Sequence, residues 1–164
     1  MTTIQIAASI LFIGLIYFII CQSSARQLQV SISGRLHSRT QYYGFFAALM
    51  AWLPAYALLI VIAVGDDIVF QSLSLNFIPD EVQTDPDFNE IIAQAQIKNL
   101  VSGTNFGKQP DWAHAAADAW QRWIVTSARL TTVVCLSLAL LGGFLGYYKV
   151  NPNFRSRNAV EGIV

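Results

Sequence analysis

Three long runs of apolar residues, separated by polar stretches, dominate the pattern along the chain. They cover residues 4–21, 44–64 and 130–148, and none of them contains Asp, Glu, Lys, Arg or His. A helix of 18 residues extends roughly 27 Å, close to the thickness of a bilayer's hydrocarbon core. Lipid offers the backbone no hydrogen-bond partner, so each run is expected to be helical. The pattern predicts an all-α membrane protein with three transmembrane helices.

Composition strengthens this prediction. The 164 residues are 54% hydrophobic and 12% charged, whereas an average soluble domain has roughly 25% charged residues. The formal net charge is zero, so no overall field attracts nucleic acid, and no nucleic-acid partner is expected. The two cysteines, Cys21 and Cys135, lie inside apolar runs. They are expected to be small core residues because they are too few for a disulfide framework.

The distribution of charge predicts the orientation, because positive residues near span ends stay in the cytoplasm. Residues 22–43 contain Arg26, Arg35 and Arg39 without any acid, and residues 149–164 carry three basic residues against Glu161. Residues 65–129 instead carry nine acids and four basic residues: Asp66, Asp67, Asp80, Glu81, Asp85, Asp87, Glu90, Asp111 and Asp118 against Lys98, Lys108, Arg122 and Arg129. The N-terminus and residues 65–129 are therefore expected outside, and the other two segments inside.

This gives a predicted order along the chain. Residues 1–21 form the first span from outside to inside, and residues 22–43 form a basic cytoplasmic loop. Residues 44–64 cross back outward, residues 65–129 form an acidic outer segment, and residues 130–148 cross inward again. Residues 149–164 form a cytoplasmic tail that begins an amphipathic helix. The basic loop is expected to lie on the anionic inner leaflet or to dock a cytoplasmic partner.

Two stretches of the outer segment are expected to be helical. Residues 87–100 place Phe88, Ile91, Ile92, Ala95 and Asn99 on one face after an acidic start. Residues 111–129 follow Pro110, and the helix is expected to continue into the third span. That second helix carries a stripe at helical spacing: Trp112, Ala116, Trp120 and Trp123. A membrane-interface or packing role is favoured for the stripe over a ligand platform.

Small residues and a proline mark the expected contacts between spans. Gly142 and Gly146 form a GxxxG motif, and Ala139 with Gly143 has the same spacing, which predicts a surface that another helix approaches closely. Pro54 removes one hydrogen bond in the second span and predicts a kink. Four tyrosines at the inner ends of the second and third spans are expected to form an aromatic belt: Tyr42, Tyr43, Tyr147 and Tyr148.

Nothing in the sequence predicts catalysis. There is no nucleophile–base pair and no cluster of metal ligands, so we expect no enzyme activity, no catalytic residue, no cofactor and no metal. The acidic run from Asp80 to Glu90 lacks the alternating oxygen ligands and central glycine of a calcium loop. Spans without charged residues argue against a conduction path of their own and favour a scaffold.

The tail carries a resemblance to a known family. Residues 151–164 read NPNFRSRNAVEGIV, with Asn151 to Glu161 as the specific part. This phrase, following a third span, a basic loop and an acidic outer segment, resembles the N-terminal region of the permease subunit of bacterial phosphate ABC transporters. The subunit is the C member of the Pst system, in the longer form with extra helices ahead of its transport domain.

The resemblance implies a function and a set of partners. It implies an inner membrane protein with a periplasmic N-terminus and a periplasmic segment at 65–129, in an ATP-driven importer of inorganic phosphate. Besides membrane lipids, the implied partners are a second permease subunit, a cytoplasmic ATPase and a periplasmic phosphate-binding protein. They belong to the full-length protein.

One departure from the family pattern limits this inference. Permeases of this class couple to their ATPase through an EAA-type motif, and the chain contains no such motif. The core transport helices are missing too, so the chain is expected to be a fragment or an N-terminal domain, and no substrate-binding residue can be carried over. Two alternatives stay open: the input region of a membrane sensor or signalling protein, and a free-standing scaffold subunit.

Overall fold

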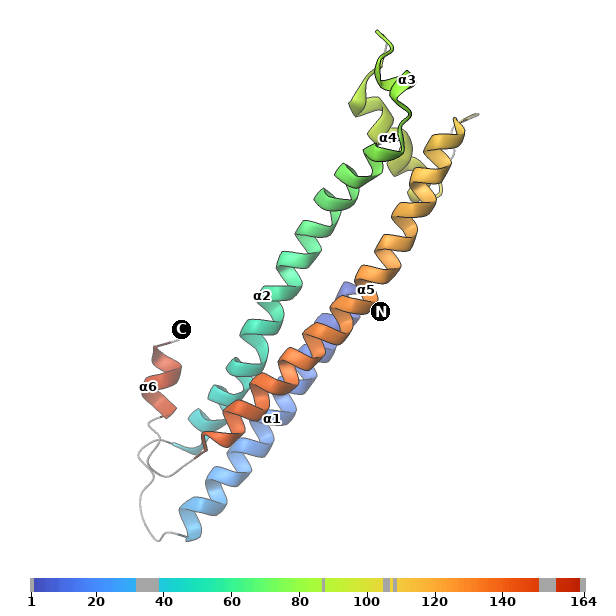
Figure 1. Ribbon diagram of the computed structural model, residues 1–164. Coiled ribbons are helices and arrows are strands. Elements are labelled where there is room, and N and C mark those ends of the chain that lie inside the picture. Colours follow the sequence, from blue (N-terminus) through green and yellow to red (C-terminus); the bar gives the residue numbers. More distant parts are fainter. Residues whose placement is uncertain are drawn as a thin grey trace. The chain divides into compact units, whose positions relative to one another are not determined.

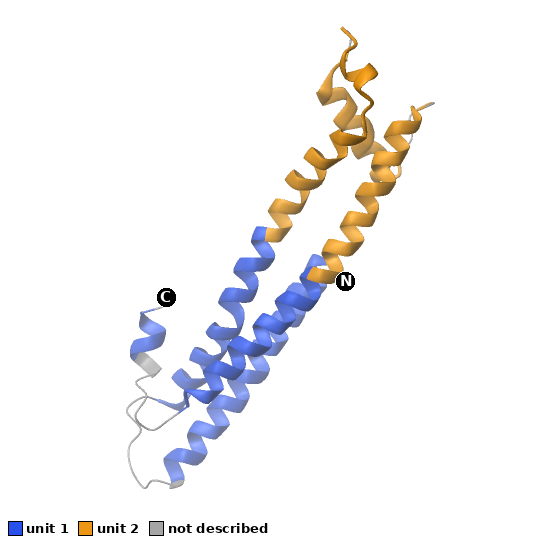
Figure 2. Ribbon diagram, in the orientation of Figure 1, with its two compact units in different colours: residues 1–61, 131–164 blue, residues 62–130 orange. Residues whose placement is uncertain are grey.

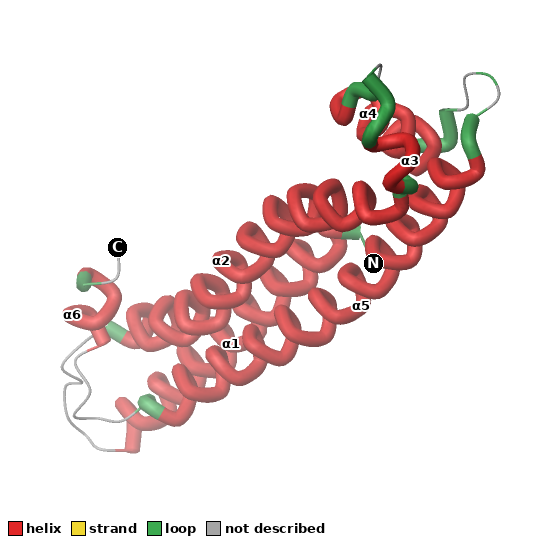
Figure 3. The backbone as a smooth tube through the Cα atoms, turned by 45° about the horizontal axis from the view of Figure 1, so that its top comes forward, coloured by secondary structure: helices red, strands yellow, loops and turns green. Residues whose placement is uncertain are grey.

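The chain folds into helices joined by short connections. A computed structural model describes residues 2–31, 39–86, 88–104, 107, 109–150 and 156–162. Its elements are α1 (Thr3–Ser31), α2 (Thr40–Ser74), the 3₁₀ turn η1 (Leu75–Phe77), α3 (Asp80–Gln83), α4 (Glu90–Val101), α5 (Asp111–Tyr148) and α6 (Ser156–Glu161) (Figure 1). No strand occurs within the described ranges (Figure 3). The predicted all-α class is confirmed.

Three of these helices are long and apolar enough to cross a membrane. The candidate spans are Thr3–Val30, Thr40–Phe77 and Asp111–Tyr148. The three predicted spans are therefore confirmed, and α5 is one continuous helix from the tryptophan stripe to the end of the third span, as expected.

The helices extend beyond the apolar runs that predicted the spans. α1 continues past Cys21 to Ser31, and α2 begins at Thr40 and continues past Val64 to Ser74. The predicted loop 22–43 is therefore shorter, and its residues 32–38 lie outside the described part. Residues 22–31 contain no Gly or Pro, and a helix already nucleated in the apolar run propagates through good helix formers whether or not they are polar.

The chain divides into two compact units (Figure 2). Unit 1 comprises Met1–Val61 and Thr131–Val164, and unit 2 comprises Ile62–Leu130. The bounds of unit 2 are close to those of the predicted segment between the second and third spans. The long helices α2 and α5 each contribute one part to unit 1 and the other part to unit 2.

Unit 1 has a core of small and aliphatic residues from α1, α2 and α5. One buried cluster contains Ile6, Ile10, Ala55, Leu59, Cys135 and Ala139. Cys21 and Cys135 are both buried and free, so the prediction that they are core residues is confirmed. Large apolar side chains point outward instead; among them are Leu11, Phe12, Ile19, Leu53, Ile60, Val133, Leu141 and Phe144. Large apolar side chains on the outside fit a bundle surrounded by lipid.

Unit 2 has a core of large side chains. Phe70 of α2, Ile97 of α4 and Ala116 and Trp120 of α5 form its buried cluster. Val101, Trp112 and Trp123 pack against it. The packing role expected for the tryptophan stripe is thus confirmed. The stripe lies on the helix that continues into the third span.

The buried face of α4 is a different one from the face that carries Ile91 and Ile92. Ala93 and Ile97 are the buried residues of this helix, whereas Ile91 and Ile92 are 75% and 56% exposed. α4 carries two apolar stripes, and the one that contains Ile97 continues to Val101, which packs on the core. The helix also starts three residues later than predicted, because the Asn89 side chain accepts a hydrogen bond from the Ile91 N–H and caps it.

Candidate functional site

The predicted glycine motif lies at a close crossing of α2 and α5 within unit 1. A Cβ atom placed on Gly146 would lie 2.6 Å from the Cα of Ala47. A Cβ atom on Gly142 would overlap the carbonyl oxygen of Met50 and lie 3.2 Å from the Cα of Ala51. As the residue number rises along α2, the number of the residue opposite it in α5 falls, so the two helices are antiparallel. The packing surface predicted from the GxxxG motif is confirmed.

Pro54 explains why this crossing centres on Met50. A proline has no N–H, so the carbonyl group of Met50, four residues earlier, loses its donor within the helix. Gly142 approaches that oxygen so closely that only a hydrogen fits where a Cβ would stand. The neighbouring helix covers the carbonyl that the proline frees, as lipid cannot.

α1 packs on this pair through large side chains placed over glycines. The Trp52 ring occupies the space beside Gly14, and the Tyr17 ring lies against Gly143. Trp52 Nε1 donates to the Leu11 carbonyl over 3.3 Å, and the Tyr56 hydroxyl donates to the Ala7 carbonyl over 2.8 Å. Trp52 and Tyr56 thus connect α2 to α1 by hydrogen bonds, and the Tyr17 ring connects α1 to α5 by packing.

One of the predicted belt tyrosines has another role. Tyr43 is only 1% exposed and belongs to the core, so the prediction that it lies in an outward-facing aromatic belt was wrong. Tyr147 and Tyr148 are 42% and 80% exposed and remain available for a headgroup position. Tyr43 differs because it stands beside Phe46 and Ala47 on the buried face of α2, a neighbourhood that its sequence position near a span end does not reveal.

Polar contacts in unit 2 join α2, α4 and α5 around the aromatic core. The Ser127 hydroxyl donates to an Asp66 carboxylate oxygen, which connects α5 to α2. Gln71 of α2 donates to Gln94 of α4, and Gln121 of α5 donates to the Val101 carbonyl over 3.5 Å. Trp123 also lies 5.9 Å from Phe70, measured between ring centroids. The segment between the spans is therefore an ordered unit.

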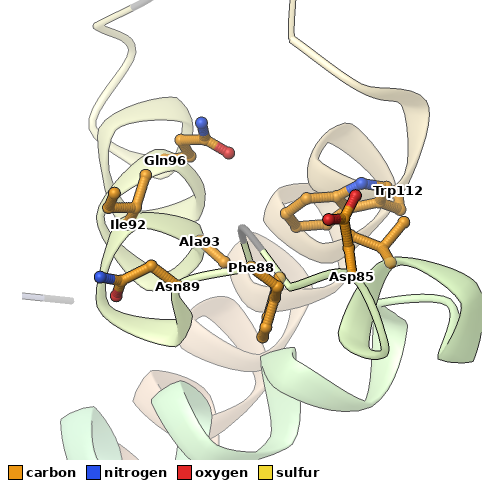
Figure 4. A pocket seen from close by; sticks show the side chains of 8 residues that line it. Asp85, Phe88, Asn89, Ile92, Ala93, Gln96 and Trp112 are labelled. Carbon is orange, nitrogen blue, oxygen red and sulfur yellow. The ribbon is translucent and has the colours of Figure 1, made fainter.

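A pocket of about 240 Å³ opens in unit 2 between α4 and the start of α5 (Figure 4). It is lined by Val82, Asp85, Phe88, Asn89, Ile92, Ala93, Gln96 and Trp112. In Figure 4 Trp112 of α5 lies across the pocket from Ile92, Ala93 and Gln96 of α4, and Asp85 is another of the lining residues. The sequence alone does not reveal this pocket, because Phe88 lies in the connection before α4 and Trp112 lies in α5, and only the fold brings them together.

The described residues include no group of three or more His, Cys, Asp or Glu side chains that could hold a metal ion. Asp85 lines the pocket from the connection between α3 and α4, and Glu90 and Asp111 stand at the starts of α4 and α5. The arrangement offers apolar walls, a carboxylate and amides, which suit binding.

Comparison with known proteins supports the family resemblance that was inferred from the tail. No curated protein and no solved structure is detectably similar to the chain. The model of one protein family matches residues 7–164, which is nearly the whole chain, and its description is phosphate ATP-binding cassette transporter. The match runs from within α1 to beyond α6 and so includes parts of both units. The chain therefore belongs to the phosphate ATP-binding cassette transporter family.

Proposed function

We propose that the chain is the N-terminal membrane domain of the permease subunit of an ATP-driven importer of inorganic phosphate. In this role it is a scaffold or partner contact, with no complete transport pathway and no enzyme activity of its own. The family match over residues 7–164 supports the transporter. The glycine and alanine crossing of α2 and α5 is the observation that supports a scaffold.

The filled interior of unit 1 is the physical reason for the scaffold role. At the crossing, backbone lies on backbone, and rings occupy the spaces beside Gly14 and Gly143. Among the described residues of unit 1 the buried polar side chain is Thr131, which is uncharged. Pathways for ions and charged substrates use polar or ionisable groups inside the membrane. A closely packed bundle is better suited to holding other parts in place.

The proposal includes a location and partners. The protein is placed in the bacterial inner membrane, with its N-terminus and unit 2 in the periplasm and α6 in the cytoplasm, on the basis of the loop charges. Its partners in the full-length protein are the second permease subunit, the ATPase and the periplasmic phosphate-binding protein. Membrane lipids cover the outward-facing apolar side chains of unit 1.

A deletion in the full-length transporter tests this proposal. Removing residues 1–148 should lower the amount of permease that co-purifies with its ATPase, while the transporter that still assembles keeps its preference for phosphate over sulfate. Gly142→Leu should reproduce the assembly defect because it forces α2 and α5 apart, and Gly65→Ala is the control because nothing lies within 4 Å of its Cβ position. Normal assembly with lost selectivity would contradict the scaffold role. Normal uptake with a lost transcriptional response to phosphate would favour the sensor alternative.

A further inference from the structure

The pocket of unit 2 continues into an exposed apolar surface. Ile92 lines the pocket and is 56% exposed, and its neighbour Ile91 is 75% exposed. Phe88 and Trp112 are half-buried at the pocket wall. We define the α4 surface as Phe88, Ile91, Ile92 and Trp112 with the pocket between them. An exposed apolar patch rimmed by polar groups is typical of a binding surface.

This surface lies too far along α5 for the bilayer to cover it. Trp112 precedes Leu130, where the third apolar run begins, by 18 residues, which is roughly 27 Å of helix. Asp118, Arg122 and Arg129 lie on the intervening stretch and are exposed. Charged side chains on that stretch keep it in water. The α4 surface is therefore exposed to an aqueous partner and not to lipid.

The charges around the pocket determine what kind of group fits it. Asp85 lines the pocket, Glu90 follows the lining residue Asn89, and Asp111 precedes Trp112. The nearest base on α4, Lys98, is exposed in the last turn of the helix, eight residues from Glu90. A cation beside a carboxylate and over an indole ring gains both ionic and cation–π attraction. The occupant should be positively charged.

The size of the pocket favours a side chain of a protein over a free ligand. Pockets for small molecules usually enclose roughly 300–1,000 Å³, whereas this pocket encloses about 240 Å³. The adjoining Ile91 and Ile92 offer apolar area that a small cation would leave exposed. We propose that the α4 surface docks a protein segment that inserts one arginine or lysine side chain into the pocket and lays apolar neighbours on Ile91 and Ile92. The proposal is independent of the transported substrate.

A peptide titration tests the proposal on the full chain in lipid nanodiscs. The probe is a five-residue peptide with a central arginine flanked by leucine and valine, and its partner probe replaces arginine by the uncharged norleucine. Fluorotryptophan labelling gives separate ¹⁹F resonances, with Trp112 identified by Trp112→Phe. The arginine peptide should shift the Trp112 resonance saturably and leave that of Trp52, in the unit 1 bundle, unchanged. The norleucine peptide should bind at least about fivefold more weakly.

Substitutions complete the test. Asp85→Asn and Ile92→Ser should each weaken binding about threefold or more, since one removes charge and the other exposed apolar contact. Asp118→Asn is the matched control: it removes the same charge from an exposed position of α5 that does not line the pocket. Equal binding of the norleucine peptide, or equal weakening by Asp118→Asn, would overturn the proposal. A shift of the same size by tetramethylammonium at the same concentration would also overturn it, in favour of a small-cation site.

Discussion

Units 1 and 2 differ at their closest helix contacts. In unit 1 the small residues Ala47, Ala51 and Gly142 form the crossing of α2 and α5, although the unit's core also contains Ile10 and Leu59. Unit 2 places Phe70 and Trp120 inside. The hydrophobic effect drives large side chains together only where water is the alternative, whereas in lipid a close approach of backbones supplies the attraction. Two helices that continue through both units therefore change their packing principle along their length.

The largest expected effect is in unit 2. Trp120 is 4% exposed, so Trp120→Ala should lower the free energy of unfolding of unit 2 by about 3–5 kcal/mol. The half-exposed Trp112 provides the comparison, and Trp112→Ala should cost clearly less. Chemical denaturation of the full chain in nanodiscs, monitored by hydrogen exchange of α4, measures the loss of unfolding free energy in both variants. Equal costs would show that burial does not determine stability there.

A glycine pair tests the crossing in unit 1. Gly142→Ala should destabilise the bundle by about 2–3 kcal/mol, because the added methyl group overlaps the Met50 carbonyl. Gly65→Ala, also within a long helix but in open space, should stabilise by up to about 1 kcal/mol through helix propensity. Unfolding in bilayers by steric trapping measures the difference. A stabilising Gly142→Ala would rule out the close crossing.

A smaller effect is expected for a hydrogen bond in the bundle. Tyr56→Phe removes the donor to the Ala7 carbonyl, and the loss should be about 1 kcal/mol, as for other hydrogen bonds between membrane helices. The same bilayer unfolding experiment measures it. Tyr148→Phe is the control, because Tyr148 is 80% exposed. An equal loss in both variants would mean that the contact contributes nothing specific.

The smallest effect is expected on the α4 surface. Ile91→Gln should change the stability of unit 2 by no more than about 0.5 kcal/mol, since the side chain is 75% exposed. Denaturation midpoints of unit 2 measure this. Ile97→Gln, at a fully buried position of the same helix, should cost several times more. If Ile91→Gln were as costly, the observed face of α4 would be incorrect.

The sequence was sufficient for the features that depend on local pattern. Uncharged runs predicted the three spans, Gly142 and Gly146 predicted the helix crossing, and Pro110 with the tryptophan stripe predicted a helix continuous with the third span. These sequence patterns are reliable because a bilayer-spanning segment must be long, apolar and helical, whatever its tertiary contacts are.

Other features depend on tertiary contacts and were missed or wrong. α4 carries two apolar stripes of similar strength, and only the contact with Phe70 and Trp120 selects the one with Ile97. Tyr43 resembles an interface residue in sequence but packs inside the bundle. The sequence did not predict that Gly142 covers the Met50 carbonyl, because this contact requires Pro54 and Gly142 together. The pocket likewise needs Phe88, from the connection before α4, and Trp112 of α5 together.

The most direct test follows one helix from water into lipid. Spin labels at exposed positions of α5 would be measured for accessibility to oxygen and to a water-soluble nickel chelate, at Asp118, Val125, Leu130, Val133, Leu140 and Phe144. We predict high nickel accessibility at Asp118 and Val125, a crossover near Leu130, and high oxygen accessibility from Val133 to Phe144. Nickel accessibility that remained high at Leu140, or oxygen accessibility already dominant at Asp118, would contradict the division of α5 between an aqueous and a lipid-embedded unit.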